Sequence, residues 1–334
     1  MKLILLPILA ATALVVSCSE WTDPRNVDFL PRMTTYDPAA LADLRAFKAS
    51  EHPLLMMHVE GTPSAPNRQN QHPMAMPDSV DFLLMSRVDG LHASLVAEVA
   101  EVRAAKGTRT LNLVSYDAIR SNWEALRAEA VEAGRADEYS ETKFADYCRT
   151  ETRKQLEYCV TYGLDGVVAS YLGGYDAEPA APFVLAVDAW ANEHADKLLF
   201  LRGYPSYVAR IEGQTLVLRC NYLIILAEDA RASVSISRMV REQLTEGVPT
   251  DRVILETSVP VLADGGGDPL SDAAVRTAAE WVMDPRTSST VRCDKRGLCI
   301  SNAPDDYFNK PTYRRIREAL AILNPAADES NSEN

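Results

Sequence analysis

The sequence lacks several features that would point to common classes of partner and cofactor. Positive charge is scarce: 34 Lys and Arg stand against 47 Asp and Glu, which gives a net charge of −13. We therefore expect no nucleic acid or other polyanionic partner, because such partners are bound mainly through basic residues. No Gly-x-Gly-x-x-Gly follows the first apolar strand, and no Cys or His spacing is typical of a zinc site. The sequence thus predicts no cofactor and no metal.

Long apolar runs are also missing, except at the N-terminus. After Lys2, residues 3–16 are almost all apolar, a length typical of a signal-peptide core and too short to span a membrane. The run ends in Leu-Val-Val-Ser-Cys, residues 14–18, a bacterial lipobox pattern in which Cys18 would be lipidated. Acyl chains there would anchor the protein in a membrane, at about 0.8 kcal/mol per buried methylene. The alternative is an ordinary signal peptide followed by a chance cysteine.

Five further cysteines lie beyond the lipobox. Cys293 and Cys299 flank a plausible turn at Lys-Arg-Gly, so a small disulfide loop between them stays open on the sequence alone. Cys148 and Cys159 lie on a helical stretch, and Cys220 opens an apolar strand. We predict that these three are buried thiols.

Short apolar runs alternate with longer amphipathic runs over most of the remaining chain. Short, mainly apolar runs are typical of parallel strands that are buried on both faces. Their alternation with helices predicts an α/β fold, a single-domain (β/α)8 TIM-type barrel, with an open doubly wound sheet as the alternative. The predicted strands are residues 54–59, 80–85, 110–114, 166–171, 198–201, 222–226, 252–256 and 297–300.

The same patterns divide the chain into four parts. We predict a lipoprotein signal peptide over 1–18, a polar leader or linker over 19–50, the barrel over 51–324 and a loose tail over 325–334. The leader would hold the barrel away from the lipid surface.

Three stretches carry a resemblance to a known family: Met-Pro-Asp-Ser-Val-Asp at 76–81, Tyr-Gly-Leu-Asp-Gly-Val at 162–167, and the run 302–325 with its Asp-Tyr, Pro-Thr-Tyr and Leu-Asn-Pro pieces. They resemble glycoside hydrolase family 18, in particular the endo-β-N-acetylglucosaminidase-like lipoproteins of Bacteroidetes. Ser-Glu-Trp-Thr-Asp-Pro at 19–24 is similar to the export leader of that group. The resemblance implies a barrel, N-acetylglucosamine-containing glycan such as N-glycan, and display as an outer-membrane lipoprotein at the cell surface.

The catalytic motif of that family is Asp-Gly-x-Asp-x-Asp-x-Glu on the fourth strand, where alternate residues face the barrel mouth. The resemblance implies that the Glu protonates the glycosidic oxygen and that the Asp before it holds the substrate's N-acetyl group. Asp165 matches the opening of the motif, but Val168, Ser170 and Leu172 stand where the three carboxylates belong. General acid catalysis is typically worth about 10²–10⁴-fold, and leucine cannot supply it. We therefore expect a pseudoenzyme with no catalytic residue on this strand.

A relocated acid is the route by which the protein could still be a hydrolase. Carboxylates near the predicted mouth are Glu60 after the first strand, Glu228 and Asp229 after the sixth, and Glu256 on the seventh. Each is equally explained as a solvated loop charge or a salt-bridge partner.

Side chains at the predicted strand ends are candidate sugar contacts, because pyranose rings pack on aromatic faces. Tyr171 and Tyr204 are favoured, since barrel sites form at the C-terminal strand ends. The full predicted ligand-binding set is Tyr116, Tyr171, Tyr175, Arg202, Tyr204, Glu256 and Trp281. The hypothesis is a non-catalytic surface lipoprotein that binds glycan for neighbouring glycan-uptake proteins. The alternatives are an active endo-acting hydrolase and an interaction lipoprotein that binds no sugar.

Overall fold

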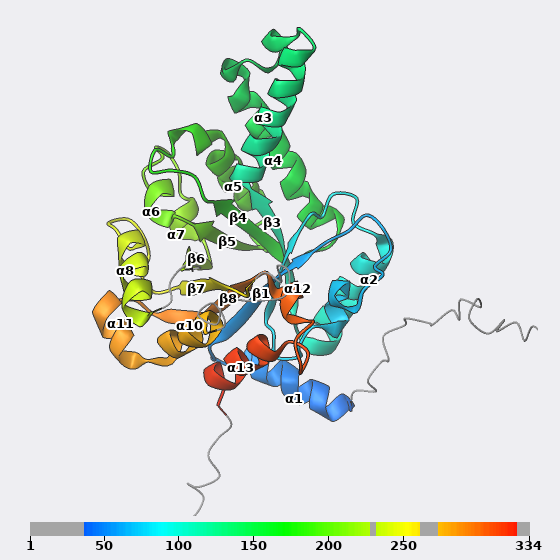
Figure 1. The fold of residues 1–334 in the computed structure, drawn as a ribbon, viewed down its shortest axis with the longest axis vertical. Coiled ribbons are helices and arrows are strands. Elements are labelled where there is room, and N and C mark those ends of the chain that lie inside the picture. Colours follow the sequence, from blue (N-terminus) through cyan, green and yellow to red (C-terminus); the bar gives the residue numbers. More distant parts are fainter. Residues whose placement is uncertain (1–36, 228–231, 261–272, 326–334) are drawn as a thin grey trace, which may run out of the picture. The chain divides into compact units, whose positions relative to one another are not determined.

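The computed structural model describes residues 37–227, 232–260 and 273–325. Eight parallel strands close into a barrel in the order β1 to β8, and helices surround it (Figure 1). The (β/α)8 prediction is therefore confirmed. The strands are β1 Leu54–Glu60, β2 Phe82–Ser86, β3 Arg109–Ser115, β4 Gly166–Tyr171, β5 Leu198–Gly203, β6 Tyr222–Leu226, β7 Val253–Ser258 and β8 Lys295–Ser301.

Most of the helices follow the strands in the expected alternation. The longer ones are α1 Pro38–Ala49, α2 Ala93–Lys106, α3 Tyr116–Glu132, α4 Phe144–Thr161, α5 Ala181–Glu193, α8 Ser233–Gln243, α10 Ala274–Met283 and α13 Arg314–Leu323. The shorter ones are α6 Pro205–Val208, α7 Leu216–Arg219, α11 Pro285–Val291 and α12 Ala303–Asp306. In this part of the chain, no helix combines the length and the apolar character that crossing a membrane requires.

Among the longer helices, α3 was predicted without bounds and α1 was not predicted. Helix α3 begins directly after β3, where the Ser115 side chain accepts a hydrogen bond from the Ala118 N–H. The C-terminal end of α3 and the N-terminal end of α4 project together beyond the other helices (Figure 1). Helix α1 lies inside the range predicted as a leader. None of its residues is buried, so the helix has no apolar face whose spacing could have predicted it. Its Lys48 nonetheless donates to the Val80 carbonyl at 2.6 Å, which ties the helix to the amino end of β2.

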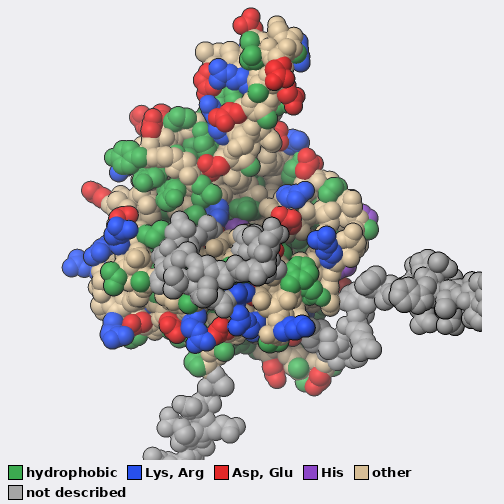
Figure 2. Space-filling view, in the orientation of Figure 1, with side chains coloured by type: hydrophobic (Ala, Val, Ile, Leu, Met, Phe, Trp, Pro, Cys, Tyr) green, Lys and Arg blue, Asp and Glu red, His purple; other side chains and the backbone are tan. Residues whose placement is uncertain are grey.

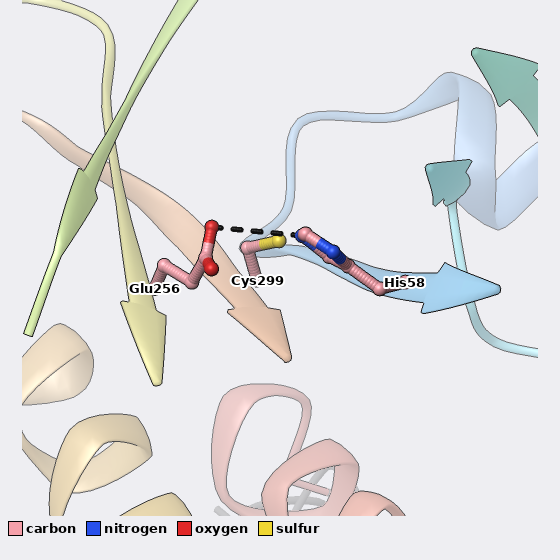
Figure 3. Close-up of side chains that lie close together, drawn as sticks. All are labelled: His58, Glu256 and Cys299. Carbon is pink, nitrogen blue, oxygen red and sulfur yellow. Dashed lines mark ion pairs between the residues drawn. The ribbon is translucent and has the colours of Figure 1, made fainter. Parts of the chain in front are cut away.

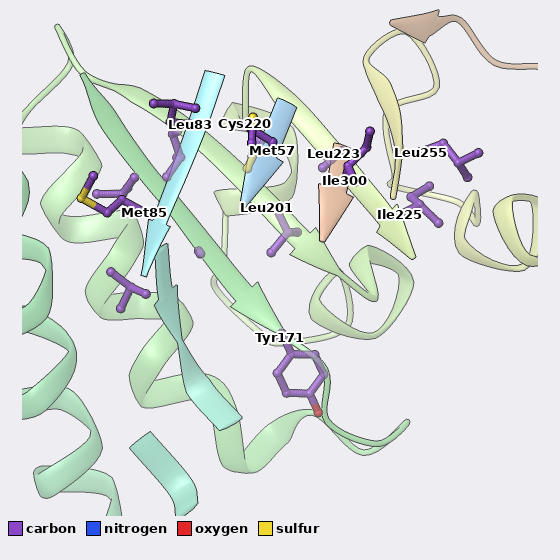
Figure 4. Packing of buried hydrophobic residues seen from close by; sticks show 14 of the residues in the cluster. Met57, Leu83, Met85, Tyr171, Leu201, Cys220, Leu223, Ile225, Leu255 and Ile300 are labelled. Atoms are coloured by element: carbon purple, nitrogen blue, oxygen red, sulfur yellow. The ribbon is translucent and has the colours of Figure 1, made fainter. Parts of the chain in front are cut away.

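The core has two apolar layers because successive strand residues face opposite sides. The inner layer fills the barrel axis and contains Met56, Phe82, Leu84, Leu111, Val168, Phe200, Ile224, Ile254 and Cys299. The outer layer lies between strands and helices and includes the intervening residues, such as Met57, Leu83, Tyr171 and Leu255 (Figure 4). This alternation decides which strand-end side chains can reach the barrel mouth.

The cysteines of the barrel are all thiols. Cys299 faces the inner layer, while Cys293 lies in the outer one, so the structure does not contain the disulfide loop considered above. Burial raises the pKa of Cys148 to about 11 and that of Cys159 to about 12. The signal peptide and Cys18, the segment 19–36 and the tail beyond residue 325 lie outside the described residues.

Candidate functional site

Among the residues that the structure describes, two large hollows lie at the end of the barrel where the strands finish, the usual place of binding sites in this architecture. The first, which we call the polar pocket, has a volume of about 580 Å³. Its strand-end lining consists of His58, Glu60, Ser86, Arg202 and Ser301. Loop residues complete it, among them Arg68, Asn70, Asn302 and Asp305.

The second hollow, which we call the tyrosine groove, has a volume of about 630 Å³. It lies between the loop after β4, the helix α6 after β5, and α8. Hydrophobic side chains, a class that includes tyrosine, gather over α6 in the space-filling view (Figure 2). The groove is lined by Leu172, Tyr175, Tyr204 and Tyr207 on one side and by Arg238, Met239 and Glu242 of α8 on the other.

A buried ion pair lies at the floor of the polar pocket. Arg202 donates from Nε to Oε2 of Glu256 at 2.7 Å and from Nη2 to Oε1 at 2.6 Å. Its Nη1 also donates to the Ser170 hydroxyl at 3.0 Å. Burial alone would raise the pKa of Glu256, but His58 and Arg202 together hold it far below its usual value. Two predicted ligand-binding residues, Arg202 and Glu256, are thus bound to each other.

The three motif positions on and after β4 face inward or toward the mouth, as the alternation predicted. Val168 belongs to the inner apolar layer, and Ser170 is buried against Arg202. Leu172 has 38% of its surface exposed and lines the tyrosine groove, and its N–H donates to Oδ2 of Asp117 at 2.7 Å. Strand β4 itself, Gly-Val-Val-Ala-Ser-Tyr, brings no carboxylate to the barrel interior.

Two of the predicted aromatic residues line the tyrosine groove. Tyr175 is 65% exposed, and its ring centroid lies 5.5 Å from that of Tyr207. Tyr207 in turn lies 5.2 Å from Tyr204. The guanidinium of Arg210 sits over the Tyr175 ring at 3.8 Å from its centroid, which holds that exposed ring in place.

Three other predicted aromatic residues are not in either hollow. Tyr171 points away from the mouth into the outer layer, 5.5 Å from the ring of Tyr116, and donates its hydroxyl to the Gly174 carbonyl at 2.8 Å. Burial raises the pKa of both tyrosines to about 12. Trp281 is buried and donates from Nε1 to the Ser237 hydroxyl at 2.9 Å. The prediction that these three residues contact sugar is wrong, because their rings are buried and pack in the core.

The carboxylates considered for a relocated acid lie in different parts of the structure. Glu60 is exposed at the rim of the polar pocket and pairs with Arg87 at 3.5 Å. Glu256 is fully buried, with both oxygens bound by Arg202. Glu228 and Asp229 lie outside the described residues.

The structure adds residues that the predicted set omitted. Tyr207 follows the fifth strand as Tyr204 does, and it completes the tyrosine groove three residues beyond Tyr204. His58 points into the barrel mouth beside Glu256, with 3.6 Å between Nε2 and Oε2, and Cys299 lies next to both (Figure 3). No local pattern could show this cluster, because its members come from β1, β7 and β8.

Comparisons with solved structures support the architecture. A selenomethionine form of BT1044 aligns with a TM-score of 0.60 at 16% identity, over 87% of this chain and 94% of that one. An endo-β-N-acetylglucosaminidase from Cordyceps militaris in its apo form gives 0.58 at 13% identity, over 87% and 97% of the two chains. A mutant of that enzyme in complex with fucosyl-N-acetylglucosamine-Asn gives 0.56 at 13% identity, over the same shares. At these identities the likeness shows the fold alone.

Comparison with curated proteins gives no match. The family assignment comes instead from a family model, described as glycoside hydrolase family 18, BT1044-like, which matches residues 22–322. That range includes all eight strands of the barrel and both hollows at its mouth. The chain therefore belongs to glycoside hydrolase family 18, in its BT1044-like group.

Proposed function

We propose that this protein is a lipid-anchored protein of the outer cell surface that binds N-acetylglucosamine-containing glycan, such as N-glycan, without cleaving it. The observation that carries the proposal is the tyrosine groove. It combines an exposed ring at Tyr175, held by Arg210, with the rings of Tyr204 and Tyr207. Aromatic faces bind the apolar faces of sugar rings, and the flanking Arg238 and Glu242 offer partners for hydroxyl groups.

The absence of cleavage is inferred from the carboxylates at the mouth. Glycoside hydrolysis needs a group that can protonate the leaving oxygen and a second group that stabilises the charge. Strand β4 supplies Val168 and Ser170 at its inner face, and Leu172 follows. Glu256 cannot serve as the acid near neutral pH, because its lowered pKa keeps it ionised and Arg202 occupies both oxygens.

The glycan class and the location rest on other support. The family, and the ligand of the Cordyceps militaris complex, favour glycan that contains N-acetylglucosamine. The lipobox ending at Cys18 supports membrane anchoring, and a role beside glycan-uptake proteins would explain a binding protein on the surface. The competing function is an interaction lipoprotein that binds no sugar.

A glycan array with the full chain, purified in detergent, tests the proposal, with mass spectrometry of recovered ligands to detect cleavage. We expect binding to intact N-glycans with no released product. Tyr175→Ala and Tyr204→Ala should each weaken binding by about 2- to 13-fold, the equivalent of about 0.5–1.5 kcal/mol per aromatic contact. Tyr158→Ala, on the barrel helix α4, is the matched control and should bind like the unchanged protein.

Each other outcome has a defined meaning. Binding with release of product would place a catalytic acid elsewhere in the chain and contradict the non-catalytic part. Failure to bind any glycan would favour the interaction lipoprotein. Incorporation of labelled fatty acid that survives Cys18→Ala would contradict the lipid anchor.

A further inference from the structure

The cluster His58, Glu256 and Cys299 plays no part in the proposed glycan site. The three side chains come from β1, β7 and β8, which are consecutive around the barrel, and all point to its interior (Figure 3). Cys299 stands opposite Glu256 in the β7–β8 pairing and opposite Met56 in the β1–β8 pairing, two residues before His58. One donor atom from each side chain lies within 4.8 Å of the other two.

The separation between His58 and Glu256 suits a shared ion better than a hydrogen bond. His58 Nε2 lies 3.6 Å from Glu256 Oε2, beyond normal hydrogen-bond length, and this buried nitrogen makes no hydrogen bond to any of the residues that the structure describes. Around a tetrahedral zinc ion, bonds of about 2.0–2.3 Å put neighbouring donor atoms roughly 3.3–3.8 Å apart. The observed separation falls in that range, so the ring and the carboxylate need little movement to bind one ion.

We propose that His58, Glu256 and Cys299 form a binding site for a divalent metal ion of the zinc class, with a water from the polar pocket as fourth ligand. Imidazole nitrogen, thiolate sulfur and carboxylate oxygen are the donors that zinc takes in proteins, and three protein ligands leave one position for water. His58 also lines the polar pocket, which gives the ion a path of entry. This site is separate from the tyrosine groove.

Arg202 is compatible with the ion but limits its affinity. A carboxylate has about four lone-pair sites, and the two bonds from Arg202 use one on each oxygen of Glu256. Metal-bound carboxylates are commonly held by such a second partner. The guanidinium charge nevertheless repels a cation, and the Cys299 thiol must lose its proton when the ion binds. We therefore expect binding that weakens as the pH falls.

Cobalt(II) titration of the full chain tests the proposal, because a thiolate bound to cobalt gives a charge-transfer band in the near ultraviolet. Cys18→Ser is included in every sample so that this residue adds no thiol. We expect the band in this background and in Cys293→Ser, the matched control in which a buried thiol outside the cluster is removed. Cys299→Ser should lose the band, His58→Gln should weaken cobalt binding at least tenfold, and zinc should displace cobalt and abolish the band.

Thermal unfolding provides a second readout that does not depend on the band. Zinc should raise Tm in the Cys18→Ser background and in Cys293→Ser, and should leave Tm of Cys299→Ser unchanged. A band that persists in Cys299→Ser, or no band and no zinc effect on Tm in the background protein, would overturn the proposal. The cluster would then be an ion pair of His58 and Glu256 beside a packed thiol.

Discussion

The guanidinium of Arg202 holds both carboxylate oxygens of Glu256, although the two residues lie on strands separated by β6. The pair spans the barrel mouth above the inner apolar layer, where Phe200 and Ile254 lie two residues earlier on the same strands. A bidentate Arg–carboxylate pair combines charge with fixed geometry. Because the pair is buried, removal of either partner takes the bidentate partner away from a charge that is largely shielded from water.

Removal of one partner should therefore destabilise the protein strongly. We expect Arg202→Met to lower the free energy of unfolding by about 3–5 kcal/mol, because the buried carboxylate of Glu256 then loses the guanidinium that binds both of its oxygens. The double variant Arg202→Met, Glu256→Met should recover much of this loss. Urea unfolding measures both. Arg87→Met, which breaks the exposed pair with Glu60, is the control and should cost at most about 1 kcal/mol. Equal losses for the buried and exposed pairs would contradict this account.

Substitutions in the tyrosine groove should affect glycan affinity, whereas substitutions of the buried aromatic residues should affect stability. Trp281→Phe leaves the buried Ser237 hydroxyl without its donor, which should cost roughly 1–3 kcal/mol of stability and leave glycan affinity unchanged. Tyr175→Ala should show the reverse, since this ring is mostly exposed. Thermal unfolding and glycan titration on the same two proteins check the prediction. If Trp281→Phe lost glycan affinity while keeping its full stability, Trp281 would belong to the glycan-binding site after all.

The position of Tyr171 shows what sequence reasoning could and could not reach. The eight strands were predictable because each is a short apolar run, and strand alternation correctly placed Val168 and Ser170 on the inner face. The same alternation turns Tyr171, the next residue after Ser170, toward the helices. A residue at the end of a strand faces the mouth only when it lies an even number of residues from the inward-facing ones. Closeness to the strand end was therefore not enough to select Tyr171.

Other features depended on contacts that no local pattern shows. The Arg202–Glu256 pair joins residues 54 positions apart, so only the closed barrel reveals it. The cluster of His58, Glu256 and Cys299 likewise exists because β7, β8 and β1 are neighbours in the closed sheet.

Stability should depend on pH through His52 at the amino end of β1. Its Nε2 lies 3.0 Å from Oδ1 of Asp81, and this hydrogen bond is the main cause that raises the pKa of the imidazole above its usual value. The charged form is thus favoured in the folded protein. The resulting stabilisation is fully present below the unfolded pKa of about 6.5 and is lost as the pH rises through the folded pKa.

The substitution His52→Gln should reveal this dependence. We expect it to lower Tm more at pH 6 than at pH 9, because only the protonated ring gains from the Asp81 carboxylate. Thermal unfolding of both proteins across this range gives the measurement, with His194→Gln as a second histidine variant for comparison. A Tm difference that is constant with pH, or larger at pH 9, would show that the ring does not carry this charge.

The Asp165-Gly166 pair, the part of the family motif that remains, is explained by packing in this protein. Asp165 Oδ2 accepts a hydrogen bond from the Thr110 N–H at 2.8 Å, and its Oδ1 lies 2.7 Å from Nε of Arg103. Gly166 pairs with Leu198 of β5, and a Cβ at Gly166 would lie 2.2 Å from the Leu198 carbonyl oxygen. Any side chain there would force β4 and β5 apart.

Gly166→Ala should therefore be costly despite the small size of the added group. We expect a loss of about 1–3 kcal/mol in the free energy of unfolding, the usual range for overpacking in a close-packed barrel. Gly174→Ala is the matched control, because a Cβ there would meet nothing within 4 Å, and it should leave stability nearly unchanged. Urea unfolding of the two variants separates the cases. Equal losses of unfolding free energy in the two variants would show that close strand packing does not account for glycine at 166. A loss confined to Gly166→Ala would show that barrel geometry alone favours this glycine of the motif.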